Sequence, residues 1–159
     1  FGISKGGSVG LLAAAGDPWV RCVASDVGYA TYTTMVPYMR KWVHLYIKSA
    51  KRLRAGIPDW FYGLVGLAAV RTSAGRRGVT FLNLERALSR YRKPLLMIHG
   101  QADTYIKPEM ARSLFDRAAT PEAAKELWLV ARAKHNQALA VAGADYHRKL
   151  TAFFDAHLA

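Results

Sequence analysis

The spacing of hydrophobic positions changes along the chain and separates three zones. Residues 8–16 form a short apolar run that predicts a buried helix, ended by Gly16 and by Pro18. A second apolar run, residues 20–24, has the length of a strand. Residues 35–92 are mostly helical in pattern. Four large apolar side chains recur there at helical spacing: Tyr38, Trp42, Leu45 and Tyr46.

The third zone alternates between strands and helices. Residues 95–98 and 127–130 are continuous apolar runs, typical of strands buried on both faces of a sheet. Pro108 opens a predicted helix after the first run, and residues 145–158 form an amphipathic helix after the second. This order predicts right-handed crossovers and an α/β fold with a parallel sheet.

Composition adds limits to this pattern. The chain has 159 residues, 52% of them hydrophobic, which suits one globular domain with a sizeable core. Its single cysteine, Cys22, lies in an apolar run and is predicted to be a buried structural thiol. The uncharged stretch 60–70 is too short to span a bilayer, and no signal segment is visible. We therefore expect no membrane span and, by default, a cytoplasmic location.

Charge is concentrated in the middle of the chain. The net charge is +12, and residues 27–93 hold thirteen Lys or Arg against only Asp59 and Glu85. This basic, aromatic segment could attract phosphates, carboxylates or an anionic membrane surface. The alternative is a solvated face above an aromatic core. No specific nucleic-acid partner is expected, because no known nucleic-acid-binding pattern accompanies the charge.

The start of the chain fits the G-x-S-x-G frame, in which a serine sits on a sharp turn between a strand and a helix. Gly2 and Gly6 flank Ser4 and are expected to permit strained backbone angles, while Gly7 lets the helix lie close to the sheet. Such a short match is weak by itself, because glycine-rich turns with a serine are common.

Two further residues strengthen the motif. Chemistry gathers beyond the carboxyl ends of strands in open parallel sheets, and Ser4, Asp103 and His135 each follow a predicted strand position. A serine hydroxyl needs an imidazole base, and that base needs a carboxylate to orient it. The backbone N–H of Lys5 would then stabilise an oxyanion.

Other residues compete for these roles. Asp26 also follows an apolar run and is the rival acid, although Asp103 has the better turn context. His99 is expected to be a hydrogen-bonded core histidine. The Lys5 side chain either reaches an acidic group of a substrate or points to solvent. No histidines and carboxylates show metal-ligand spacing, so no metal site is expected.

Together these motifs resemble the C-terminal half of an α/β-hydrolase, closest to the dienelactone-hydrolase-like and prolyl-oligopeptidase-like branches. The matching segments are residues 2–7, 94–108, 133–136 and the closing helix that ends in Phe153-Phe154. The resemblance implies a serine hydrolase with Ser4 as nucleophile, Asp103 as acid and His135 as base. It implies a small-molecule acyl substrate and no cofactor. Residues 1–34 and 93–159 would form a partial core, and residues 35–92 a helical cap or lid.

The sequence departs from that family before Ser4, where a complete member has further strands and a loop with the second oxyanion donor. We expect three parallel strands with an exposed edge, and self-association through that edge unless another segment covers it. Weak or no turnover is expected of the isolated chain. An ester is the expected substrate. The alternatives are a serine peptidase or acyltransferase of the same fold, or a non-catalytic basic module that binds anionic partners.

Overall fold

The structure of the protein, a computed structural model, describes residues 1–30, 32–46, 56–81 and 83–158. The chain divides into two compact units. The first unit combines residues 1–30 with residues 84–159 and contains the sheet. The second unit, residues 31–83, is helical in its described parts.

The sheet of the first unit has four parallel strands in the order β1-β2-β3-β4. Their bounds are β1 Gly2–Ile3, β2 Val23–Asp26, β3 Leu95–Gly100 and β4 Lys125–Val130. Ile3 pairs with Asp26, Asp26 with Ile98 and Ile98 with Trp128. The predicted parallel α/β sheet is confirmed, and all four carboxyl ends meet at one edge.

The sheet differs from the sequence-based expectation in two strands. Three strands were expected, but Gly2 and Ile3 pair with β2 and form a fourth at the edge. The strand expected at residues 20–24 begins only at Val23 and extends through Asp26. The apolar pattern misplaced it because its last residues, Ser25 and Asp26, are polar yet fully or almost fully buried.

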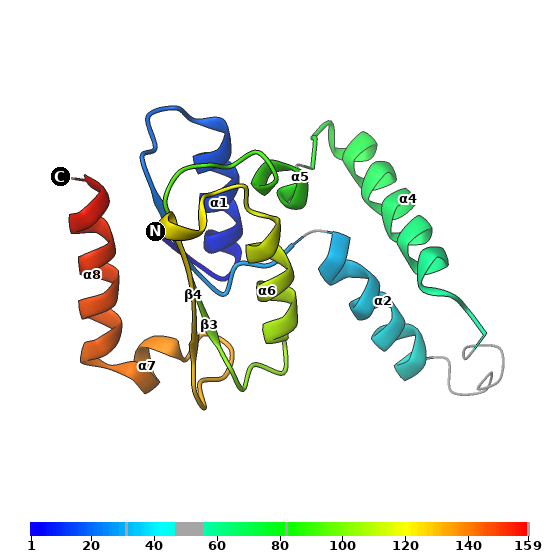
Figure 1. Ribbon diagram of the computed structural model, residues 1–159. Coiled ribbons are helices and arrows are strands. Elements are labelled where there is room, and N and C mark those ends of the chain that lie inside the picture. Colours follow the sequence, from blue (N-terminus) through cyan, green and yellow to red (C-terminus); the bar gives the residue numbers. More distant parts are fainter. Residues whose placement is uncertain (31, 47–55, 82, 159) are drawn as a thin grey trace. The chain divides into compact units, whose positions relative to one another are not determined.

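Helices cover both faces of this sheet. Their bounds are α1 Lys5–Gly16, α5 Leu84–Leu88, α6 Pro108–Arg117, α7 Ala138–Ala142 and α8 Ala144–Leu158, with a 3-10 turn at Glu122–Ala124. Figure 1 shows α1 and α6 on one side of the sheet and α8 on the other. Leu11, Leu95 and Met97 belong to the core on the first side, while Leu96, Ile98 and Tyr146 belong to the core on the second.

Helix α1 starts directly after Ser4, three residues earlier than the apolar run predicted. Leu11 and Ala14 are completely buried and hold the helix against the sheet. At the carboxyl end, the ammonium group of Lys93 donates to the carbonyls of Ala14, at 3.2 Å, and Asp17, at 2.5 Å. A cation at this position satisfies carbonyls that have no partner within the helix.

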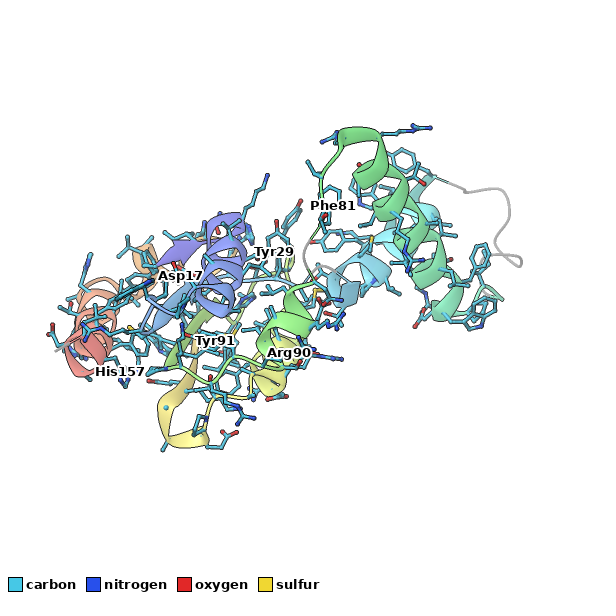
Figure 2. The ribbon with its side chains drawn as sticks, turned by 90° about the horizontal axis from the view of Figure 1, so that it is seen from above. Asp17, Tyr29, Phe81, Arg90, Tyr91 and His157 are labelled. Atoms are coloured by element: carbon cyan, nitrogen blue, oxygen red, sulfur yellow. The ribbon has the colours of Figure 1, made fainter. Side chains whose placement is uncertain are left out.

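Residues 84–92 pack with the first unit, although the sequence analysis assigned them to the insertion. Leu84, Leu88 and Tyr91 are each at most 2% exposed and belong to the core cluster of α1 and α6. The hydroxyl of Tyr91, which is labelled in Figure 2, donates to the carbonyl of Pro94 at 3.0 Å. Residues 84–92 therefore belong to the sheet unit, because their large apolar side chains pack in its core.

The described residues of the second unit form two helices, α2 Tyr32–Tyr46 and α4 Asp59–Arg77. They pack closely, since a Cβ on Gly66 would lie 2.9 Å from the sulfur of Met35 and 3.0 Å from that of Met39. Helix α4 ends at Gly78, whose φ of 62° suits a left-handed cap. Residues 47–55, which belong to the zone predicted to be mostly helical, lie outside the described residues.

Two predictions from composition concern Cys22 and membrane spans. Cys22 is a free thiol that is 6% exposed, and burial raises its pKa, in agreement with the predicted buried thiol. Among the described residues, no helix combines the length and the apolar character needed to cross a membrane.

Leu11 and Val9 offer a matched test of how α1 is held. Leu11 is completely buried, whereas Val9 is 57% exposed on the same helix. We expect Leu11→Ala to lower the free energy of unfolding by about 2–5 kcal/mol, because it leaves a cavity in the core. Val9→Ala should change it by less than about 1 kcal/mol. Urea unfolding followed by circular dichroism measures both, and equal losses would contradict this packing.

Candidate active site

Ser4 stands at the junction between β1 and α1, at the carboxyl edge of the sheet. Its backbone angles, φ 53° and ψ −118°, lie in a region that side-chain-bearing residues rarely occupy. Its N–H donates to the carbonyl of Asp26 at 2.7 Å, which ties the turn to β2. Strain of this kind costs about 1–3 kcal/mol and is typical of functional sites.

Glycines on either side make this turn sterically possible. A Cβ on Gly2 would lie 2.2 Å from the carbonyl oxygen of Gly6, and one on Gly7 would lie 2.5 Å from the hydroxyl of Ser25. Gly6 was expected to be needed as well, but a Cβ there would meet no neighbouring atom within 4 Å. The steric requirement therefore falls on Gly2 and Gly7, where α1 approaches the sheet.

His135 lies in the loop that follows β4, and its side chain is 26% exposed. Two residues of this loop, Arg132 and Asn136, have positive φ angles of 63° and 57°. The loop lies against the end of β3, since a Cβ on Gly100 would be 2.4 Å from the carbonyl oxygen of Ala133. The close approach at Gly100 brings the loops after β3 and β4 together.

Ser4, His135 and Asp103 are connected through the imidazole. The hydroxyl oxygen of Ser4 is 3.5 Å from Nε2 of His135, and Nδ1 of His135 is 2.8 Å from Oδ2 of Asp103. An ionised carboxylate only accepts hydrogen bonds, so Nδ1 carries the proton and Nε2 faces the serine as an acceptor. The structure thus brings together the three side chains that the sequence singled out.

The loop after β3 fixes the carboxylate of Asp103, which is only 3% exposed. Its Oδ1 accepts the backbone N–H groups of Tyr105 at 2.8 Å and Ile106 at 3.0 Å. These two donors hold the carboxylate so that Oδ2 faces His135. The ring of Tyr105 also meets the imidazole edge-on, with ring centres 5.1 Å apart.

Asp26, the rival acid, has a different partner. Its Oδ2 accepts the hydroxyl of Tyr146 on α8 at 2.8 Å, while Oδ1 has no hydrogen-bond partner among the described residues. The side chain is 2% exposed, and this burial raises the pKa of its carboxyl group, although the hydrogen bond from Tyr146 opposes the effect. Of these two carboxylates, it is Asp103 that bonds to His135.

His99 is completely buried at the end of β3. Its Nε2 lies 2.8 Å from the carbonyl oxygen of Ile106, which makes Nε2 the protonated donor. His99 is therefore a hydrogen-bonded core histidine, as predicted, and it supports the loop that carries Asp103.

Lys5 is the first residue of α1. The first N–H groups of a helix have no carbonyl to pair with in the helix, and they point toward the positive end of its dipole. The Lys5 amide is therefore available to a negative charge that develops beside Ser4. The lysine residue itself is exposed.

Sequence reasoning missed the polar role of Tyr146. It assigned Tyr146 only to the apolar face of the last helix, where it does contact the core. The available signal was Asp26, since a buried carboxylate needs a hydrogen-bond donor. Within the part of the chain that the structure describes, no group of three or more His, Cys, Asp or Glu side chains could hold a metal ion.

Several solved structures share this fold. An esterase from Pyrococcus furiosus has 19% sequence identity and a TM-score of 0.65, over 99% of this chain and 53% of its own. The esterase domain of a Rhodothermus marinus protein has 18% identity and a TM-score of 0.60, over 99% and 59%. An α/β hydrolase from Penicillium has 20% identity and a TM-score of 0.59, over 99% and 63%.

These likenesses show that the chain has an α/β-hydrolase fold, and that it spans between about half and two thirds of the length of these structures. No protein-family model matches the sequence, and no curated protein matches it either.

Gly2 and Gly6 provide a matched test of the turn around Ser4. We expect Gly2→Ala to lower the free energy of unfolding by about 2 kcal/mol or more, because its methyl group would collide with the Gly6 carbonyl. Gly6→Ala should be neutral or stabilising, since alanine favours a helix over glycine by about 1 kcal/mol. Thermal and urea unfolding measure both changes. A larger loss of stability from Gly6→Ala would refute the conclusion that the turn requires a glycine at position 2 and not at position 6.

The burial of Asp26 predicts a dependence of stability on pH. A carboxyl group whose pKa is higher in the folded state stabilises the fold while protonated, and that contribution is lost as pH rises through the folded pKa. Asp26→Asn should therefore gain stability relative to the unmodified protein between about pH 4 and neutral pH. Urea unfolding of both proteins across this range measures the difference, which would stay constant if Asp26 did not ionise.

Proposed function

We propose that the chain forms the nucleophile, acid and base of a serine hydrolase that cleaves a carboxylic ester or a related acyl bond. The observation that carries this proposal is the connected series of Ser4, His135 and Asp103, with contacts of 3.5 Å and 2.8 Å. Independent support comes from the fold, which is shared with proteins described as esterases. No cofactor is needed for this chemistry.

The first half of the reaction is acyl transfer to the serine. Nε2 of His135 takes the proton of Ser4 as the hydroxyl oxygen attacks the acyl carbon, and Asp103 stabilises the imidazolium that forms. The present distance of 3.5 Å between the hydroxyl and Nε2 is long, as is common before a substrate is bound. The imidazolium then gives its proton to the leaving alcohol, and an acyl-enzyme remains.

The second half returns the enzyme to its starting state. His135 removes a proton from a water molecule, which attacks the acyl carbon and releases the acid, while the proton returns to Ser4. In both halves a negative charge develops on the acyl oxygen. The Lys5 amide and the N-terminal end of α1 would stabilise that charge.

Esters are favoured because the similar structures include esterases, whereas a serine peptidase or an acyltransferase would use the same three side chains. We propose that residues 31–83 are the variable insertion of this fold, because in the sequence they separate β2 from the remaining elements of the sheet unit.

A non-catalytic binding module is the second candidate. The excess of Lys and Arg in residues 27–93 favours it, since such a surface binds anionic partners. It gives no account of why Ser4 keeps a strained backbone beside an oriented imidazole. Strong salt dependence of binding, without labelling of Ser4, would favour this module over the hydrolase.

Reactivity of Ser4 is the direct test of the hydrolase. A fluorophosphonate probe should label Ser4 in the protein as its gene encodes it, because the base activates this hydroxyl. Peptide mapping by mass spectrometry locates the label, and Ser4→Ala should abolish both labelling and ester hydrolysis. Absence of labelling in protein that is shown to be folded would contradict the proposal.

The two buried carboxylates supply a control for this experiment. Asp103→Asn should lower kcat by about 10³–10⁴-fold, because the imidazole loses the partner that fixes its tautomer. Asp26→Asn should lower kcat far less, since Asp26 bonds to Tyr146 and not to His135. A larger loss from Asp26→Asn would transfer the role of acid to that residue.

A further inference from the structure

The unit formed by residues 31–83 exposes large apolar side chains that the proposed chemistry does not use. Trp42, Leu45 and Tyr46 at the end of α2 are 48%, 54% and 75% exposed. Trp60 and Phe61 in the first turn of α4 are 65% and 44% exposed. We call these five residues the aromatic tip. The sequence analysis left open an aromatic core beneath a solvated basic face, but these side chains lie on the surface.

Both halves of the aromatic tip lie at the same end of the helix pair. An ion pair of 2.9 Å joins Arg40 on α2 to Asp59 at the start of α4. Gly66, two turns further along α4, packs against Met35 and Met39, which lie between the first turn and the middle of α2. The helices therefore run antiparallel, and the first turn of α4 lies beside the later part of α2 (Figure 1).

The apolar stripe of α2 explains why the tip is exposed. Met35, Met39, Trp42 and Tyr46 follow one another at spacings of three or four residues, which places them on one helix face. The two methionines are packed near α4, but the stripe continues past the first residue of α4. Trp42 and Tyr46 stack on each other, with ring centres 5.6 Å apart.

The charge of this unit is strongly positive. Among the described residues of 31–83, the single acid is Asp59, and the basic and exposed residues are Arg40, Lys41, Arg71, Arg76 and Arg77. Asp59 is paired with Arg40, and Lys41, next to Trp42, is exposed. Exposed aromatic groups are thus carried by a segment with almost no negative charge.

We propose that the aromatic tip docks this unit onto the surface of a bilayer that contains anionic lipids. Tryptophan and tyrosine favour the boundary between lipid tails and water, because their rings are apolar and carry one polar group. Basic residues add attraction to anionic headgroups of about 1 kcal/mol each near the surface. The two requirements for reversible surface binding, buried apolar area and positive charge, meet in the same unit.

A bilayer fits these observations better than the other occupants do. Nucleic acid accounts for the positive charge but not for exposed Leu45 and Phe61, which offer no hydrogen bond to a base or phosphate. A second copy of the chain would place two strongly positive units against each other. The proposal does not rest on hydrolysis, so Ser4→Ala protein should bind equally well.

Sedimentation with lipid vesicles tests the proposal. The protein should bind to phosphatidylcholine vesicles that contain about one third phosphatidylglycerol. It should bind much more weakly to vesicles of phosphatidylcholine alone. Joint replacement Trp42→Ala and Trp60→Ala should weaken binding by on the order of tenfold or more, since both rings lose apolar burial. Lys41→Glu should weaken binding to the anionic vesicles only, without any change to an apolar contact.

Trp19 supplies the matched control. It is 90% exposed and belongs to the other unit, so Trp19→Ala removes an exposed tryptophan that is not in the aromatic tip. Trp19→Ala should bind vesicles like the unmodified protein, and circular dichroism verifies that each variant is folded. Lack of vesicle binding, or an equal loss with Trp19→Ala, would overturn the proposal. Formation of a dimer that covers the aromatic tip and prevents vesicle binding would also overturn it. Binding to duplex DNA in place of vesicles, unchanged by the tryptophan replacements, would do the same.

Discussion

The parallel register of the four strands is the constraint on which the rest of the structure depends. It aligns Ile3, Asp26, Ile98 and Trp128, so the chain leaves every strand at the same edge of the sheet. Parallel strands pair through evenly spaced backbone hydrogen bonds, and each strand must then turn into a helix or loop that begins the crossover to the next. The backbone strain lies in these turns. Of the four non-glycine residues with positive φ among those described, Ser4, Val27 and Arg132 lie within two residues of a strand end, and Asn136 lies further along the loop after β4. Burial of the sheet on both faces maintains these conformations.

Hydrogen bonds then separate four titratable side chains that meet at this edge. Asp103 receives two backbone N–H groups on one oxygen and the imidazole of His135 on the other. Asp26 receives the hydroxyl of Tyr146 and interacts with the last helix, while His99 donates to a loop carbonyl. Two carboxylates and two imidazoles are thereby divided into one pair suited to proton transfer and two side chains that hold the surrounding elements. The division follows from donors and acceptors, and not from proximity alone.

The two units of the chain differ in what they bury. The sheet unit packs two clusters of apolar side chains between its sheet and its helices, although Trp19 and Tyr105 stay exposed, whereas the helix pair of residues 31–83 leaves five large apolar side chains exposed at one end. A helix pair has too little volume to enclose both apolar stripes, so part of the apolar surface stays available for contact with something else. We thus propose acyl hydrolysis for the sheet unit and contact with a bilayer surface for residues 31–83.

The sequence by itself determined the parallel α/β class and the succession of β3, α6, β4 and α8, and it singled out Ser4, Asp103 and His135, which the structure brings together. These follow from local apolar periodicity and from the rule that chemistry lies after strands, and both are readable along a chain. Tertiary structure alone decided the edge strand at Gly2, the polar end of β2, the packing of Leu84 and the pairing of Asp26 with Tyr146. The physical reason is that burial and hydrogen bonding depend on neighbours distant in sequence: a two-residue strand has no period, and a buried carboxylate finds its donor 120 residues away.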